Sequence, residues 1–332
     1  MKIKPFRGLI IFPLFCLLFL LSVNSQEKRG QMSDIVNPDH PGGLVRVEIK
    51  SKTDNHIQPA IFYKSKTRRK KPLIVSLHSW SGDYTQKDPL ALKIQELDWN
   101  YIHPDFRGRN NNPDACGSPL VISDIEDAID YALKNANVNK KEIHIIGGSG
   151  GGHATLLCYM KVGHSINSFS AWNPITNLAD WYYESVGRGN RYADDIFKAT
   201  SSEENLNIDE ALSRSPAFMD YPGRIRKNAR LFIYHGIHDG YLGSVPVTHS
   251  LHFYNELIKK IDPEEREALI SDNDIMDLLV KRCFPETMAD TEMIGDRKIH
   301  YKRNYRNIQI LIFEGQHEML NQVTLELIPA KE

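Results

Sequence analysis

The chain has 332 residues, of which 41% are hydrophobic and 25% charged, and its formal net charge is −1. A chain of this length can bury a full core in one large domain. The near-neutral charge gives no general reason to expect a nucleic acid as partner, so any electrostatic preference must be local.

The first 25 residues have the pattern of a cleavable secretory signal. Basic residues up to Arg7 precede an apolar stretch over residues 9–21, and Val23 and Ser25 occupy the small-residue positions before Gln26. The apolar stretch is too short to span a bilayer comfortably. We therefore expect a periplasmic or extracellular protein without stable membrane insertion after signal cleavage; an uncleaved anchor is the alternative.

Strands and helices alternate after a flexible lead-in over residues 26–43, which is polar and contains Pro and Gly. Period-two patterns predict an initial antiparallel pair of strands, continuous apolar runs predict buried parallel strands, and amphipathic stretches predict helices. The order predicts a single α/β domain with a mostly parallel sheet and helices on both faces. The domain covers residues 44–332. Its expected strands are 44–49, 58–63, 72–77, 99–104, 143–146, 166–172, 229–234 and 308–313. Its expected helices are 90–97, 122–134, a stretch that begins at residue 150, and 252–258.

Two segments are longer than the usual connections between such elements. Residues 174–228 are rich in aromatic and charged side chains, and residues 261–305 begin with a helical pattern and end in a basic stretch. We expect both to be inserted cap segments that lie over the strand ends and shape a pocket.

A Gly-Gly-Ser-Gly-Gly turn around Ser149 follows the strand predicted at 143–146. In a G-x-S-x-G turn between strand and helix, the serine is held in a strained backbone conformation, and Gly147 and Gly151 avoid collisions where strand and helix pass closely. The start of the helix leaves the N–H of Gly150 free to point at a developing oxyanion. A phosphate-binding loop is the alternative, but the Lys followed by Ser or Thr of such loops is missing. The turn predicts a serine nucleophile.

Two further strand ends supply a candidate acid and a candidate base. Asp239 follows the strand predicted at 229–234, and His317 follows the last predicted strand. An acid at the end of a neighbouring strand can orient a histidine and stabilise its imidazolium form. The predicted triad is therefore Ser149, Asp239 and His317, with Glu318 as the alternative acid. We expect His235 only to hydrogen-bond within its turn.

The loop after the strand predicted at 72–77 reads His-Ser-Trp-Ser-Gly. A loop at this place supplies a second oxyanion donor to serine hydrolases of this topology. We expect that donor to be the backbone N–H of Trp80, with Ser79 as the alternative. In the other interpretation the loop is a tight turn and Trp80 only caps the core.

Four further side chains are candidates for contact with a substrate. His78 and His238 lie at predicted strand ends, on the expected rim of the active site, and Arg107 and Arg109 come just after the strand predicted at 99–104. A salt bridge or a solvated loop is the alternative role of the arginines. His153, on the predicted nucleophile helix, is expected to pack in the interior.

Three cysteines remain after removal of the predicted signal, and an odd count argues against a framework that depends on disulfides. Cys158 is expected to be a small buried apolar residue. A bridge between Cys116 and Cys283 is a possibility. The spacings are not those of metal ligands.

The combination of G-G-S-G-G around Ser149, H-G-x-x-D ending at Asp239 with Val-Pro soon after, and G-x-H-E around His317 resembles the prolyl oligopeptidase branch of the α/β-hydrolase superfamily. The resemblance covers about residues 44–325. It implies an α/β-hydrolase fold and an acyl-enzyme mechanism that requires no metal or organic cofactor. Peptidases of that branch carry a β-propeller before the catalytic domain, and the sequence before Leu44 is too short to form one.

This departure makes a carbohydrate esterase the leading expectation, because the chain also resembles secreted bacterial esterases, including pectin methylesterases. The expected substrate is thus a polysaccharide or oligosaccharide ester, above all a methyl ester of galacturonate. Arg107 and Arg109 would bind the carboxylates of the neighbouring sugars in the chain. The alternatives are an acetyl esterase on glycans, a prolyl-oligopeptidase-like peptidase without a propeller, and an exported binding protein on an inactive hydrolase scaffold.

Overall fold

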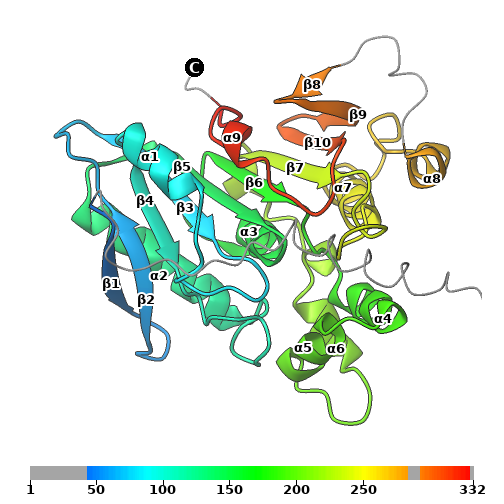
Figure 1. Ribbon diagram of the computed structural model, residues 1–332, viewed down its shortest axis with the longest axis horizontal. Helices are drawn as coiled ribbons and strands as arrows, with labels where there is room; N and C mark the ends of the chain where they lie inside the picture. The colour runs from blue at the N-terminus through cyan, green and yellow to red at the C-terminus, as the bar shows by residue number, and fades with distance from the viewer. Residues whose placement is uncertain (1–42, 283–291, 330–332) are drawn as a thin grey trace, which may run out of the picture. The chain divides into compact units, whose positions relative to one another are not determined.

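The computed structural model describes residues 43–282 and 292–329 (Figure 1). The predicted signal peptide over 1–25 and the lead-in up to residue 42 lie outside these residues. Among the helices that are described, none combines the length and the apolar character needed to cross a membrane.

A ten-stranded sheet forms the centre of the described domain. Its order is β1-β2-β4-β3-β5-β6-β7-β10-β9-β8. The strands are β1 (Val45–Lys50), β2 (Ile57–Tyr63), β3 (Lys71–Leu77), β4 (Asn100–Pro104), β5 (Val138–Gly148), β6 (Ser168–Trp172), β7 (Arg230–Gly236), β8 (Met293–Ile294), β9 (Arg297–Tyr305) and β10 (Ile308–Phe313).

Six neighbouring strands, from β4 to β10 in the order given, run parallel, and the two edges of the sheet are antiparallel. The parallel strands are almost wholly buried because helices cover them on both faces, and this is why they read as continuous apolar runs. The predicted fold class, a mostly parallel sheet with helices on both faces, is confirmed.

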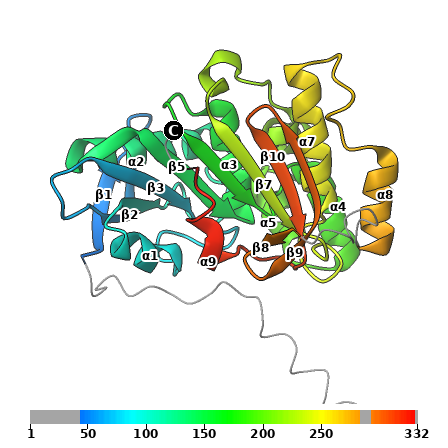
Figure 2. The same cartoon turned by 90° about the horizontal axis from the view of Figure 1, so that it is seen from above.

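Helices cover the two faces unequally (Figure 2). One face packs against α2 (Pro119–Asn135), α3 (Gly150–Lys161), α7 (Thr248–Ile261) and α8 (Asp272–Lys281) in the larger core. The other face packs against α1 (Leu90–Glu96) and the region of α9 (Asn321–Thr324). Since all the parallel strands point the same way, their carboxyl ends share one edge, where active sites of such sheets lie.

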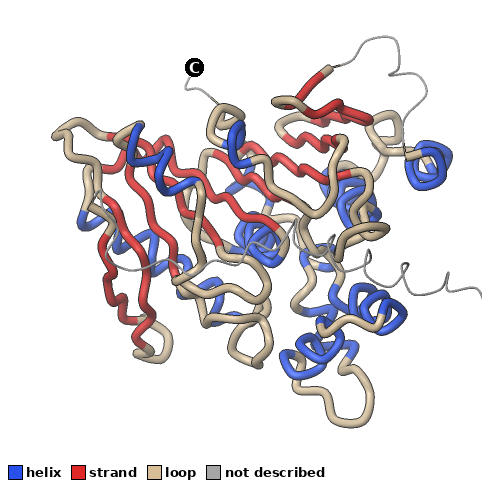
Figure 3. Tube along the Cα trace, viewed as in Figure 1, coloured by secondary structure: helices blue, strands red, loops and turns tan. Residues whose placement is uncertain are grey.

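The inserted segment 174–228 is mostly helical. It contains α4 (Leu178–Arg188), α5 (Tyr192–Ala199), α6 (Ile208–Ser213) and two short 3-10 turns, Pro216–Phe218 and Gly223–Arg226. These helices gather away from α1 (Figure 3), and they have a small apolar core of their own that includes Trp181 and, from the loop after β3, Trp80. The insertion is therefore anchored beside the ends of the central strands.

The segment 261–305 differs from the expected cap. Its basic end forms β9, which pairs antiparallel with β10 and extends the sheet. Period-two reasoning missed this strand because its sequence is mainly polar, and only its middle residues are buried. Pairing with an already buried neighbour, rather than its own apolar pattern, stabilises β9.

Candidate active site

Ser149 lies on a sharp turn between β5 and α3. Its backbone has φ 58° and ψ −119°, a strained conformation for a residue with a side chain. Glycines make the turn possible: a Cβ on Gly147 would come within 2.3 Å of the Gly151 oxygen, and a Cβ on Gly151 within 2.2 Å of the Leu77 oxygen. Residues with larger side chains at positions 147 and 151 would therefore not allow the turn that presents Ser149.

The three loops that carry the predicted triad residues are linked at the end of β6. The N–H of Ser149 donates to the oxygen of Trp172 (2.8 Å), the last residue of β6. The next residue, Asn173, donates from Nδ2 to Asp239 Oδ2 (2.7 Å) and to the backbone oxygen of Gln316 (3.0 Å). The nucleophile turn, the acid loop and the loop of the candidate base are thus linked through two consecutive residues.

Asp239 and His317 form a close pair. The distance from His317 Nδ1 to Asp239 Oδ2 is 2.6 Å. The other carboxylate oxygen accepts the backbone N–H groups of Gly240 (2.8 Å) and Val245 (3.1 Å). The Asp239 side chain is fully buried, whereas that of His317 is 22% exposed. Nδ1 is therefore bound to the carboxylate, while part of the His317 side chain remains accessible.

The pKa shifts of the pair favour an ion pair. Burial alone would raise the pKa of Asp239, but the facing His317, together with hydrogen bonds from His235 and His317, outweighs burial and holds that pKa well below its usual range. Burial would likewise lower the pKa of His317, but the Asp239 carboxylate outweighs it and raises that pKa. An acid that stays ionised and a base of raised proton affinity are what a Ser-His-Asp mechanism needs.

Two residues around Asp239 carried no catalytic role in the sequence interpretation. His235, buried at the end of β7, lies 3.1 Å from Asp239 Oδ2 through its Nε2. Asn173 has a positive φ of 45° and is buried. His235 belongs to the H-G-x-x-D motif, so the motif was a usable signal. Asn173 had only its place directly after a strand.

The loop after β3 supplies the candidate oxyanion donors. The N–H of Ser79 donates to Gln86 Oε1 (2.8 Å), which removes Ser79 from consideration. A Cβ on Gly150 would lie 2.4 Å from the backbone nitrogen of Trp80, so the two N–H groups belong to backbones in direct contact. Asn110 fixes the Trp80 carbonyl through its N–H (3.0 Å) and Nδ2 (3.3 Å). The geometry favours Trp80 and Gly150 as donors.

The Trp80 side chain also caps a core. Its indole is buried, lies 4.6 Å from the Trp181 ring in an edge-to-face contact, and donates from Nε1 to Asp195 (3.1 Å). The loop that carries the backbone donor is therefore held by the inserted helices α4 and α5. The two interpretations of Trp80 concern different atoms and are compatible.

The expected role of Arg107 as a substrate clamp is wrong. Its guanidinium pairs bidentately with Asp54 (2.8 and 3.0 Å) and with Asp124 (2.7 and 3.0 Å), and its side chain is only 5% exposed. Asp54 lies in the turn between β1 and β2, and Asp124 lies on α2. The salt-bridge alternative holds for Arg107, whereas Arg109 is exposed and its charge helps to lower the pKa of Asp83.

Of the two histidines expected at the rim, His78 lies in the interior and His238 stays partly exposed. His78 is buried, stacks on Phe106 at 3.8 Å, and places its ring nitrogens against the backbone oxygens of Ser79 (3.0 Å) and Asp105 (2.9 Å), so it holds the loop rather than a substrate. Burial lowers its pKa. His238 is 27% exposed and pairs with Glu314 (2.8 Å).

Glu318 does not compete with Asp239. Its carboxylate accepts from Arg297 (3.2 Å) and from the N–H of Gln316 (3.2 Å), not from His317. His153 is buried with its Nδ1 against the oxygen of Ile175 (2.9 Å), and burial lowers its pKa to about 4.

Cys116 and Cys158 are free thiols, both buried. Burial raises the pKa of Cys116 to about 12 and that of Cys158 further, so neither is a reactive thiolate. Cys283 lies outside the described residues. Across 43–282 and 292–329, no group of three His, Cys, Asp or Glu side chains is placed to hold a metal ion.

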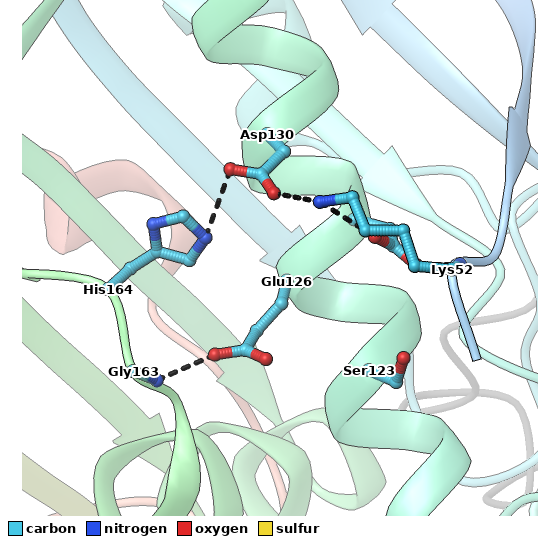
Figure 4. A pocket seen from close by; sticks show the side chains of 7 residues that line it. Lys52, Ser123, Glu126, Asp130, Gly163 and His164 are labelled. Atoms are coloured by element: carbon cyan, nitrogen blue, oxygen red, sulfur yellow. Dashed lines mark hydrogen bonds and ion pairs between the residues drawn. The ribbon is translucent and has the colours of Figure 1, made fainter.

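An open cavity of about 420 Å³ is lined by residues of α2, by Lys52 and by Gly163 and His164 after α3 (Figure 4). Its charged side chains already have partners: Lys52 contacts Asp127 and Asp130, His164 lies 3.3 Å from Asp130, and Glu126 accepts the N–H of Gly163 (2.6 Å). The cavity shares no residue with the candidate active site, and we assign it no part in catalysis.

Comparison with known proteins gives a family match over part of the chain. Residues 120–272 match the model of the prolyl oligopeptidase family, Peptidase_S9. The matched range includes Ser149 and Asp239 but ends before His317. The match indicates a serine hydrolase. No curated protein matches the sequence.

Several solved structures are similar over 65% of this chain. They include the acylaminoacyl peptidase of Pyrococcus horikoshii (19% identity, TM-score 0.51, 35% of that chain), a puromycin-hydrolyzing peptidase of Mycobacterium tuberculosis (14%, 0.51, 34%) and prolyl oligopeptidase B of Galerina marginata (15%, 0.52, 31%). The chain has an α/β-hydrolase fold. It spans about a third of the length of these peptidases.

The expected polysaccharide or oligosaccharide ester substrate is therefore wrong. The α/β-hydrolase family that matches is a family of oligopeptidases, and the similar structures named above are peptidases. The carbohydrate expectation rested on the short sequence before residue 44 and on a resemblance to secreted esterases. One of the two arginines expected to bind that substrate is buried in an ion-pair cluster.

Proposed function

We propose that this protein is a serine hydrolase that cleaves amide bonds of peptides or acylated amino acids through an acyl-enzyme. The observation that carries the proposal is the 2.6 Å contact between His317 and Asp239, beside the strained turn of Ser149. The peptidase family match over the segment that holds the serine and the acid supports the choice of an amide bond.

In the proposed mechanism, Ser149 attacks the scissile carbonyl while His317 takes the hydroxyl proton on Nε2. Asp239 keeps His317 in the correct tautomer and stabilises the imidazolium. The N–H groups of Trp80 and Gly150 stabilise the oxyanion. His317 then gives its proton to the leaving amine, and water releases the acyl group by the reverse sequence of steps.

A fluorophosphonate probe tests the nucleophile without knowledge of the substrate. The wild-type protein is expected to be labelled once, at Ser149, and Ser149→Ala is expected to lose labelling together with roughly 10⁶-fold of turnover. Ser123→Ala, on α2, is the matched control and keeps both. Labelling that persists in Ser149→Ala would remove the proposal.

Paired substrates test which bond is cleaved. Acyl-amino-acid and prolyl nitroanilides report amide hydrolysis, and nitrophenyl esters of the same acyl groups report ester hydrolysis, since a serine triad acts on both by one route. We expect release of nitroaniline. Hydrolysis confined to the esters would contradict the proposed amide specificity while leaving the serine nucleophile intact.

We also propose that the protein is exported, on the basis of the sequence pattern of its first 25 residues. Expression of the chain from Met1 onward, followed by N-terminal sequencing of the mature protein, is expected to find Gln26 first. A mature protein that begins at Met1 or Lys2 would overturn this part of the proposal.

A further inference from the structure

The carboxylate of Asp239 is surrounded by more donors than it has favourable positions. Its Oδ1 accepts two backbone N–H groups, while its Oδ2 lies within hydrogen-bond distance of His317 Nδ1 (2.6 Å), Asn173 Nδ2 (2.7 Å) and His235 Nε2 (3.1 Å). A carboxylate offers about four lone-pair positions. The three donors at Oδ2 must therefore share it, and each weakens the hold of the others.

The neighbours of His235 show which of its nitrogens carries hydrogen. Nε2 hydrogen-bonds to the backbone oxygen of Val245 (3.1 Å) and also lies 3.1 Å from Asp239 Oδ2. Because both neighbours are acceptors, this nitrogen must be a donor, and its one hydrogen is shared between them. Nδ1 faces the hydroxyl of Ser250 (2.7 Å), which can donate to it. Because His235 and Ser250 are fully buried, no water competes for these contacts.

We propose that His235 is a positioning residue of the triad, which donates to the same Asp239 oxygen as His317 and thereby limits how strongly that oxygen holds the His317 hydrogen. The inference rests on the proposed serine mechanism and assigns a function to the histidine of the H-G-x-x-D motif. Asn173 holds the same oxygen from the end of β6, so the carboxylate is fixed from two strands besides its own loop.

The consequence concerns the proton affinity of His317. The ionisable groups that face the pair are Asp239, His317 and His235, since the nearby Glu318 carboxylate is bound to Arg297. If the His235 donor is removed, Oδ2 is left with more unshared charge and holds the imidazolium more tightly. The pKa of His317 then rises, and the active neutral form appears only at higher pH.

Two amide variants separate this role from simple packing. In His235→Gln the side-chain amide reaches the place of Nε2 and can donate to Asp239, whereas in His235→Asn it reaches only the place of Nδ1, toward Ser250. The readout is the rate of fluorophosphonate labelling from about pH 5 to about pH 9, with thermal melting to show that each variant is folded.

We compare the pH at which the labelling rate falls to half on the acid side of its profile. For His235→Gln this midpoint should equal that of the wild type, and for His235→Asn it should be higher by on the order of half a pH unit. If His235→Gln does not fold, Ser250→Ala takes its place, because it retains the Nε2 contact and predicts no shift. Identical acid limbs in the Asn variant and its comparator would overturn the inference. Labelling of Ser149→Ala would instead overturn the serine mechanism, so the two failures are distinguishable.

Discussion

Two clusters of charged side chains lie after strands of the same sheet: one around Arg107 and one around Asp239. They differ in whether a hydrogen-bonding group remains without a partner. In the arginine cluster after β4, every guanidinium contact of Arg107 goes to Asp54 or Asp124. In the triad cluster after β7 and β10, Asp239 is saturated, but His317 uses only Nδ1. Within the described part of the chain, Nε2 of His317 has no hydrogen-bond partner.

This difference separates a structural cluster from a chemical one. Charges that satisfy each other completely contribute to the fold and have no capacity left for a substrate. A histidine that is held on one side and is open on the other can move a proton. Position at a strand end was common to both clusters and did not distinguish them.

Asp239→Asn is expected to have the largest effect. The amide can donate to His317 Nδ1 and stabilise the wrong tautomer, so kcat should fall by roughly 10⁴-fold. Glu318→Gln is the matched control and should stay near wild type, because Glu318 contacts Arg297 instead. Steady-state hydrolysis of an activated ester measures both; a reversed order would make Glu318 the acid.

Gly150→Ala tests the oxyanion donors. The new Cβ would lie 2.4 Å from the Trp80 nitrogen, so the two backbones must separate and kcat should fall by roughly 10²- to 10³-fold. Gly187→Ala on α4 is the control, since a Cβ there meets nothing within 4 Å. Equal turnover in the two variants would show that the contact between Gly150 and Trp80 plays no part in catalysis.

Arg107→Ala tests the arginine cluster. The buried Asp124 would lose its partner, and the free energy of unfolding should fall by about 3–5 kcal/mol, with turnover per folded molecule unchanged. The exposed Arg109→Ala should change stability by less than about 0.5 kcal/mol. Urea unfolding combined with active-site titration measures both. A loss of turnover in folded Arg107→Ala would return this residue to the active site.

The pH dependence has the smallest expected effect. Because Asp239 raises the pKa of His317, kcat/KM should fall about tenfold per pH unit below a midpoint above the ordinary histidine value of about 6.5. The stability that the protonated His317 contributes has the opposite sign: it is fully present below its unfolded pKa and is lost as pH rises through the folded pKa. A midpoint at or below about 6.5 would contradict the raised pKa expected for His317 beside Asp239.

The sequence predicted the central strands well because burial on both faces leaves continuous apolar runs. β9 was missed, since a neighbour in the sheet stabilises its polar sequence. The role of Arg107 was missed for a similar reason: its partners Asp54 and Asp124 are 53 and 17 residues away, and no local pattern connects them.

By itself the sequence determined the α/β class, the glycine turn that presents Ser149, and the candidates Asp239 and His317, because hydrophobic periodicity and glycine sterics act over a few residues. Only the tertiary structure decided that Arg107 forms buried ion pairs and that the Ser79 N–H donates to Gln86. It also decided that His235 and Asn173 both lie against Oδ2 of Asp239. These hydrogen bonds and ion pairs join segments that are distant in the sequence, and the packing of the whole chain determines which distant segments come into contact.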